Sequence, residues 1–162
     1  MAVLDGWRPF QVQAALFNQV CERNKLLFPN LLEADIIKLS AESAARPSES
    51  LLSPYPHSTG GSLDVTLMDL EGRLVRMGTG FDEFSDYTPT RYYEAELERG
   101  RRLSLTAIEA LQNRRVRFHV MRSCGFTNYH KEWWHFDFGN QPWAIQEDTI
   151  AKYGKASLPA AL

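Results

Sequence analysis

Two histidines, an aspartate and a glutamate occur in short motifs whose spacing is typical of a catalytic metal site. His57 and Asp64 begin and end the segment His-Ser-Thr-Gly-Gly-Ser-Leu-Asp, and Glu132 precedes His135 by three positions. A catalytic zinc site needs three protein ligands of the histidine or carboxylate type, with one position left for water or substrate. His57, Asp64 and His135 can supply these ligands, and Glu132 can act as a base beside the metal.

Neither motif is specific by itself. A lone histidine is more often a hydrogen-bonded core or surface residue than a ligand, and a Glu-x-x-His pair also arises by chance. The joint occurrence is more informative, because both motifs adjoin segments with strand-like alternation. This alternation places Asp64 and His135 on the face opposite the larger apolar residues. The pattern therefore favours a metal site over two unrelated histidines.

The elements that must position these residues are predicted from hydrophobic periodicity and from the positions of Pro and Gly. Apolar residues at helical spacing predict helices, period-two alternation predicts strands, and dense Pro and Gly predict loops. The expected helices are about Pro9–Asn24, Leu31–Ala44 and Thr106–Gly125, the expected strands Leu63–Met68, Leu74–Met77 and Trp133–Phe138, and the expected loops Ser53–Ser62 and Gly78–Thr90. The third helix is expected to begin at a capping box of Thr106 and Glu109.

These elements indicate an α+β fold in which helices flank a small antiparallel sheet. The chain has 162 residues, of which 44% are hydrophobic and 12% aromatic, enough for one well-filled core without disulfides. We expect a single domain over residues 1–150 and a C-terminal tail over residues 151–162, where no periodicity is visible.

The charge balance limits the classes of partner. The 18 Lys and Arg residues face 20 Asp and Glu residues, and the isoelectric point is about 6.1, so the basic excess of a nucleic-acid-binding protein is absent. The N-terminus lacks a basic region followed by an apolar stretch, and no later apolar run is long enough to span a bilayer. We expect no nucleic-acid partner, no membrane partner and a cytoplasmic location. A homo-oligomer stays open.

Four segments, in this order, resemble the successive signatures of one family. They are Asp5–Pro9 (Asp-Gly-Trp-Arg-Pro), Pro56–Leu67, Met77–Asp82 (Met-Gly-Thr-Gly-Phe-Asp) and Gly125–Phe136. The second and fourth contain the His-x-x-Gly-x-x-x-Asp and Glu-x-x-His elements, which are similar to those of zinc carboxypeptidases in general. The first and third resemble D-alanyl-D-alanine dipeptidases in particular. Because the four motifs span nearly the whole chain, it is identified as resembling that family.

The resemblance implies the fold of zinc D-Ala-D-Ala peptidases and hedgehog-like domains, with one Zn²⁺ ion per chain. It implies that His57, Asp64 and His135 hold the zinc and that Glu132 is the general base. The implied reaction is hydrolysis of D-alanyl-D-alanine, in which Glu132 takes a proton from zinc-bound water that attacks the peptide carbonyl. The implied setting is bacterial cell-wall turnover or glycopeptide resistance.

Two further site residues follow from the same resemblance. Arg8 would stabilise the negative charge that develops in the reaction. Asp5 could order Arg8 or could equally be an N-terminal turn acid. Asp82 would bind the free amino group of the dipeptide, because a carboxylate distinguishes an ammonium from a continuing chain. Without the resemblance, Asp82 would be read as a solvated loop acid.

The sequence departs from the family pattern at two places. Only four residues precede Asp5, whereas family members usually begin well before this motif, so we expect that an N-terminal segment of the family is absent. Tyr55 stands where many relatives carry a small or hydroxylated residue. Contacts to the substrate carboxylate therefore cannot be transferred to this chain.

Two other functions remain as alternatives. Two histidines and one carboxylate also form the facial triad of non-heme iron oxygenases, although such enzymes need no base beside the last histidine. A non-catalytic zinc-binding module of the same fold is the second alternative. The presence of both Glu132 and Arg8 favours the peptidase.

Overall fold

The protein is built on a four-stranded antiparallel sheet with the strand order β1-β2-β4-β3. The computed structural model describes residues 1–83 and 85–157. The strands are β1 (Ala2–Asp5), β2 (Ser62–Thr66), β3 (Thr127–Asn128) and β4 (His135–Asp137), and the helices are α1 (Phe10–Leu27), α2 (Glu33–Ser40), the 3₁₀ helix η1 (Pro56–Thr59), α3 (Tyr92–Glu98), α4 (Leu105–Ser123) and α5 (Gln141–Gln146). The expected α+β class with a small antiparallel sheet is confirmed.

The register of the sheet places charged residues opposite one another. In the pair of β2 and β4, Asp64 lies opposite His135. Directly opposed residues have neighbouring side chains on the same face, so the strand pairing itself brings this carboxylate to this ring. An irregularity in β1 between Val3 and Asp5 shifts the register so that Asp5 also lies opposite Asp64. Such a bulge redirects the side chains that follow it.

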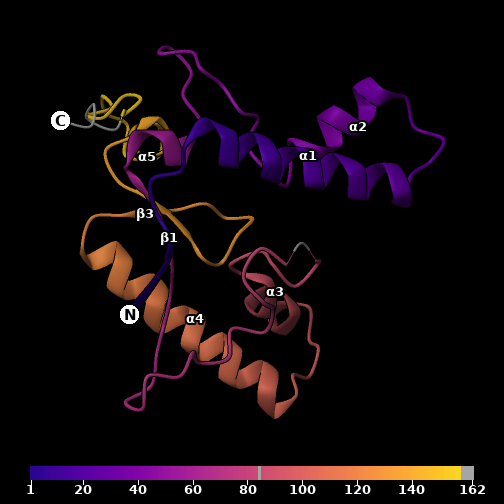
Figure 1. Cartoon of the computed structure of the whole chain (residues 1–162). Coiled ribbons are helices and arrows are strands. Elements are labelled where there is room, and N and C mark those ends of the chain that lie inside the picture. Colours follow the sequence, from indigo (N-terminus) through magenta and orange to yellow (C-terminus); the bar gives the residue numbers. More distant parts are fainter. Residues whose placement is uncertain (84, 158–162) are drawn as a thin grey trace.

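The two faces of the sheet are covered by different helices. On one face, Val65 and Phe136 form an apolar cluster with Met121 of α4, which crosses below the sheet in Figure 1. On the other face, Asp64 and His135 are buried beside residues of α1 and of the turn after α2. The predicted separation of these two polar residues from the apolar face is confirmed.

The first two helices pack side by side and extend away from the sheet (Figure 1). α1 begins one residue after Pro9, which precedes the helix instead of starting it. α2 is shorter than the predicted Leu31–Ala44, because it begins at Glu33 and ends at Ser40. The Ser40 hydroxyl is buried and accepts a hydrogen bond from Asn24 at 3.0 Å, which ties this end of α2 to α1.

The start of α4 corrects another prediction. The side chain of Ser104 accepts a hydrogen bond from the Ala107 amide, so the helix begins at Leu105 and the predicted capping box at Thr106 is wrong. The predicted end is confirmed, since Gly125 has a φ of 85°, a conformation that ends helices and favours glycine. Among the described residues, no helix is long and apolar enough to cross a membrane.

Several short elements were not predicted. β1, β3, α3 and α5 have between two and seven residues, too few to display a clear period. The expected loop at Ser53–Ser62 contains η1, whose first residue is a proline. The expected strand Leu74–Met77 is reduced to a single bridge between Met68 and Leu74.

Residues 151–157 of the expected tail fold back against the sheet end. The backbone amides of Lys152 and Tyr153 both donate to the Gly139 carbonyl, and that of Ala156 donates to the Ser58 carbonyl at 2.8 Å. Ser58 follows His57 directly, so the tail contacts the segment that carries this predicted ligand. The last residues of the tail, 158–162, lie outside the described part of the chain.

Candidate metal centre and active site

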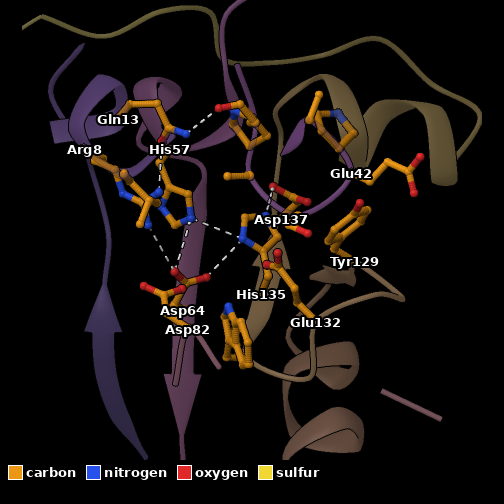
Figure 2. A pocket seen from close by; sticks show the side chains of 18 residues that line it. Arg8, Gln13, Glu42, His57, Asp64, Asp82, Tyr129, Glu132, His135 and Asp137 are labelled. Atoms are coloured by element: carbon orange, nitrogen blue, oxygen red, sulfur yellow. Dashed lines mark hydrogen bonds and ion pairs between the residues drawn. The ribbon is translucent and has the colours of Figure 1, made fainter. Parts of the chain in front are cut away.

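The side chains of His57, Asp64 and His135 converge on the polar face of the sheet (Figure 2). His57 Nε2 lies 3.2 Å from His135 Nδ1. The Asp64 carboxylate oxygens lie 3.0 Å from His135 Nδ1 and 3.4 Å from His57 Nε2. One ligand atom of each residue lies within 4.8 Å of the others, and all three residues are buried. The structure therefore brings the three predicted ligands into a group that could hold a metal ion.

The outer nitrogen of each ring is bound by the protein. His57 Nδ1 lies 2.6 Å from the Gly6 carbonyl oxygen, and a carbonyl only accepts, so this nitrogen donates its proton. His135 Nε2 lies 3.2 Å from the Asp137 carboxylate. Metal-binding histidines usually donate their other ring proton to a carbonyl or carboxylate in this way. The inner nitrogens of both rings are thus left to face Asp64.

This arrangement needs a positive charge at its centre. In the neutral tautomers that Gly6 and Asp137 favour, the two inner nitrogens are both acceptors, yet they face each other at 3.2 Å. A cation bound between them and Asp64 resolves this conflict. Two imidazoles and one carboxylate form a donor set that suits zinc and leaves a coordination position open. The residues present therefore fit the predicted metal.

The ionisation of the surrounding groups supports a cation site. Burial opposes the ionisation of Asp64, but hydrogen bonds from His135 and His57 outweigh it and hold the pKa of Asp64 well below its usual range. Burial likewise opposes charge on His135, but Asp137 and Asp64 raise its pKa well above the ordinary value. The metal-free centre thus favours a proton on His135 where a metal ion could bind instead.

Arg8 lies beside the ligand group and is held on several sides. Its guanidinium donates to Asp5 at 2.8 and 2.6 Å and to Gln13 of α1 at 2.9 Å. One terminal nitrogen also lies 3.5 Å from Asp64. Of the two roles that the sequence left open for Asp5, the structure shows both, because one carboxylate oxygen accepts from Arg8 and the other from the Gly6 amide. Three hydrogen bonds leave part of the five-donor guanidinium free for a ligand in the pocket.

The structure explains why a tyrosine stands at position 55, where many relatives carry a small or hydroxylated residue. Its ring is buried, and its hydroxyl donates to the Arg8 carbonyl at 2.7 Å. The Arg8 amide in turn donates to the His57 carbonyl. Tyr55 therefore braces the backbone of Arg8, a contact that a small side chain could not reach.

Glu132 lies in the loop before β4, as predicted, and its carboxyl group lines the same pocket as the three ligands. Burial raises the pKa of Glu132 to about 7. The nearby charge of His135 lowers this pKa, and that of Asp64 raises it. A carboxyl group that titrates near neutral pH can both accept and return a proton, as a general base must.

Asp82 also reaches this pocket, from a loop far from the strands in sequence. Burial raises the pKa of Asp82 to about 6, and the nearby Asp64 carboxylate adds to the effect. Its backbone has a φ of 54°, a left-handed conformation that is uncommon outside glycine and is often found at functional sites. Within the described part of the chain this carboxylate makes no ion pair of its own, which suits it to a positively charged ligand.

The pocket that joins these groups has a volume of about 260 Å³, at the small end of the range for ligand sites. Figure 2 shows Arg8 and Gln13 on one side of the ligand group and Tyr129 and Glu42 on the other. The remaining wall is mostly apolar and is formed by Leu16, Ala41, Ser43, Ala44, Ala45, Pro56, Trp134 and Pro142. Such a space fits a small molecule with short apolar side chains.

Three residues that support the site were not predicted. Asp137 orients His135, Gln13 holds Arg8, and Asn128 donates from its side-chain amide to the backbone carbonyls of Glu132 and His135 at 3.2 and 2.8 Å. The position of Asp137, two residues after His135 on one strand, was a usable signal. Nothing in the helical pattern marks Gln13.

Comparison with known proteins agrees with this geometry. A family model described as D-Ala-D-Ala dipeptidase, peptidase M15, matches residues 1–155. A D-alanyl-D-alanine dipeptidase of Synechocystis is 35% identical over 94% of this chain and 68% of its own length. Proteins of the same name from Enterococcus faecium and Enterococcus faecalis are 35% and 29% identical, each over 86% of this chain and 62% of their own length. The chain thus spans about two thirds of the length of these relatives, and it belongs to the D-Ala-D-Ala dipeptidase family of metallopeptidases.

Proposed function

We propose that this protein hydrolyses the dipeptide D-alanyl-D-alanine with one zinc ion. One observation carries the proposal: three candidate ligands, a candidate base, an arginine and the Asp82 carboxylate, for which the described residues show no ion pair, line one small pocket. Membership of the D-Ala-D-Ala dipeptidase family supports the substrate class. The biological setting would be bacterial cell-wall turnover or glycopeptide resistance.

The ligands would be His57 through Nε2, His135 through Nδ1 and Asp64 through its carboxylate. When bound, zinc supplies Lewis acidity that activates water and polarises a peptide carbonyl at neutral pH. The contacts from Gly6 and Asp137 hold both rings with the correct nitrogen directed inward.

Glu132 would act as the general base and then as the general acid. Its carboxylate takes a proton from the attacking water, whose oxygen forms a bond to the peptide carbon. The same carboxyl group then gives the proton to the leaving nitrogen as the carbon–nitrogen bond breaks. A pKa of about 7 suits both steps, because neither protonation state is strongly preferred at neutral pH.

Arg8 would stabilise the negative charge on the carbonyl oxygen. Its guanidinium is held by Asp5 and Gln13 before any substrate arrives. A preorganised donor of this kind does not need to reorient during the reaction and is therefore effective in stabilising the transition state.

Asp82 would bind the substrate ammonium. The pocket contains several carboxylates and only one arginine among its lining residues, so a positively charged group is strongly favoured over an acylated, neutral one. This would restrict the reaction to peptides with a free amino end, and the small volume would restrict it to short ones.

The proposal is tested by measuring alanine release from D-Ala-D-Ala, L-Ala-L-Ala and N-acetyl-D-Ala-D-Ala. We expect release from D-Ala-D-Ala alone, its loss on treatment with a chelator, and its recovery on addition of zinc. Stoichiometric zinc without release from any dipeptide would instead indicate a binding module. Turnover restored only by iron(II), with consumption of dioxygen, would indicate an oxygenase.

A further inference from the structure

Helix α4 carries two buried arginines, Arg114 and Arg117, for which the described residues provide no acidic partner within salt-bridge distance. Arg117 stacks on Trp133 and Phe136, with its guanidinium carbon 4.9 and 5.3 Å from the ring centres. Its nitrogens make no hydrogen bond with the described residues. Arg114, one helical turn away, instead donates hydrogen bonds to backbone carbonyls of one nearby segment.

That segment is the one that carries Asp82. Arg114 Nε donates to the Met77 carbonyl at 2.7 Å, and its two terminal nitrogens donate to the carbonyls of Tyr87 and Pro89, each at 2.8 Å. One carbonyl precedes Asp82 in sequence and two follow it. A single planar side chain therefore joins both ends of the Asp82 segment.

Other contacts hold the residues on either side of Asp82: the Phe81 ring packs edge-to-face on Trp134, with ring centres 5.6 Å apart, and the Thr88 hydroxyl donates to the Glu83 carbonyl. Glu83 accepts a hydrogen bond from the Gly80 amide, and the Thr79 hydroxyl accepts one from the Trp133 ring at 2.7 Å. Asp82 itself has the left-handed backbone described above, and it belongs to no helix or strand. Its position in the pocket therefore depends both on the contacts of its neighbours and on how the two ends of the segment are held.

We propose that Arg114 is a positioning residue that closes the Asp82 segment and so fixes the carboxylate that recognises the substrate ammonium. The inference rests on the proposed function for the role of Asp82, but not for the closure of the segment. The geometry explains why the residue is an arginine, because only a rigid fork of several donors can reach three carbonyls at once. Lysine keeps the charge but presents a single nitrogen.

The experiment compares Arg114→Lys and Arg114→Met with Arg117→Met, in the zinc-loaded protein. Arg117→Met is the matched control, because it removes a buried guanidinium from the same helix without touching the Asp82 segment. Hydrogen–deuterium exchange of residues 77–90 and the steady-state constants for D-Ala-D-Ala are measured for each variant. In Arg114→Lys we expect exchange in this segment to rise about tenfold and KM to rise about tenfold, with kcat within about threefold of the native value.

Unchanged exchange in residues 77–90 of Arg114→Lys, or an equal increase in Arg117→Met, would show that Arg114 does not hold the two ends of this segment together. Faster exchange with an unchanged KM would overturn the positioning role. If Arg114→Met does not fold, the Lys variant decides alone. Asp82→Asn separates the two proposals, because an unchanged KM in that variant refutes ammonium recognition by Asp82, while the exchange measurement still decides whether Arg114 closes the segment.

Discussion

Asp64 and His135 lie on paired strands, whereas Glu132, Arg8 and Asp82 all lie outside helices and strands. The distance between Asp64 and His135 is set by the backbone register of β2 and β4, which places them opposite one another. The segments of the other three are held by hydrogen bonds with side chains: Asn128 and Arg114 donate to backbone carbonyls, and Gln13 accepts from Arg8. Two of the three proposed metal ligands thus lie at a distance fixed by the sheet, while the residues proposed to meet the substrate lie on loops carried by that rigid frame.

The largest effect is expected at the strand-borne ligand His135. His135→Ala should lose bound zinc and all measurable turnover, because the remaining two ligands leave the ion incompletely held. Atomic absorption on the purified protein checks the metal content. Stoichiometric zinc in this variant would show that the ligand set is wrong. His119→Ala, which changes a histidine outside the pocket, is the matched control.

The loop-borne Glu132 should separate metal binding from catalysis. Glu132→Ala should retain zinc, since the three ligands are unchanged, while kcat falls by about a hundredfold to ten-thousandfold, the usual scale for loss of a general base. Metal content and kcat are measured on one preparation. Loss of zinc here would place Glu132 among the ligands instead.

Arg8 should affect the rate more than the metal. Arg8→Ala should reduce transition-state stabilisation by roughly 3 kcal/mol, comparable to removal of an oxyanion donor. Arg8→Lys, which keeps the charge but not the fork bound by Asp5 and Gln13, should recover part of the loss. The ratio of kcat/KM values measures both effects, and a native kcat in Arg8→Ala would exclude the role.

A smaller effect on the strand side is expected at Asp137. Asp137→Ala should weaken zinc binding by about tenfold to a hundredfold, because His135 loses the partner that orients its ring. Titration against a competing chelator gives the affinity. Asp82→Ala, which removes a carboxylate from the same pocket without contact to a ligand ring, should bind zinc as the native protein does. Equal losses would point to net charge as the cause.

The smallest effect concerns pH. Burial raises the pKa of Asp82 to about 6, so its carboxylate is charged above this pH and becomes neutral below it. KM for D-Ala-D-Ala should therefore rise as the pH falls through about 6, because a neutral carboxyl group pairs poorly with an ammonium. In Asp82→Asn the pH dependence of KM should flatten in this range. A native profile in that variant would assign the titration elsewhere.

The sequence predicted the strand side of the site better than the loop side. Alternation around Asp64 and His135 indicated their common face, because a strand has a strict period of two. Glu132 was a candidate base from its spacing to His135, whereas Arg8 and Asp82 could be assigned only through resemblance, since irregular segments carry no period. Asp137, Gln13 and Asn128 act through single side-chain hydrogen bonds to residues two to seven positions away in the chain, and hydrophobic periodicity does not report such contacts. The short strand β1 was missed for a similar reason, as four residues that pair with β2 leave no pattern of their own.

β1 has a thermodynamic consequence through the residues that follow it. The Gly6 carbonyl binds His57, and Asp5 binds Arg8, so docking of this edge strand and orientation of a metal ligand favour each other. Such coupling is reciprocal. A metal ion that selects the inward nitrogen of His57 should slow amide exchange in residues 2–8, and any disturbance that frays β1 should weaken metal affinity by the same factor.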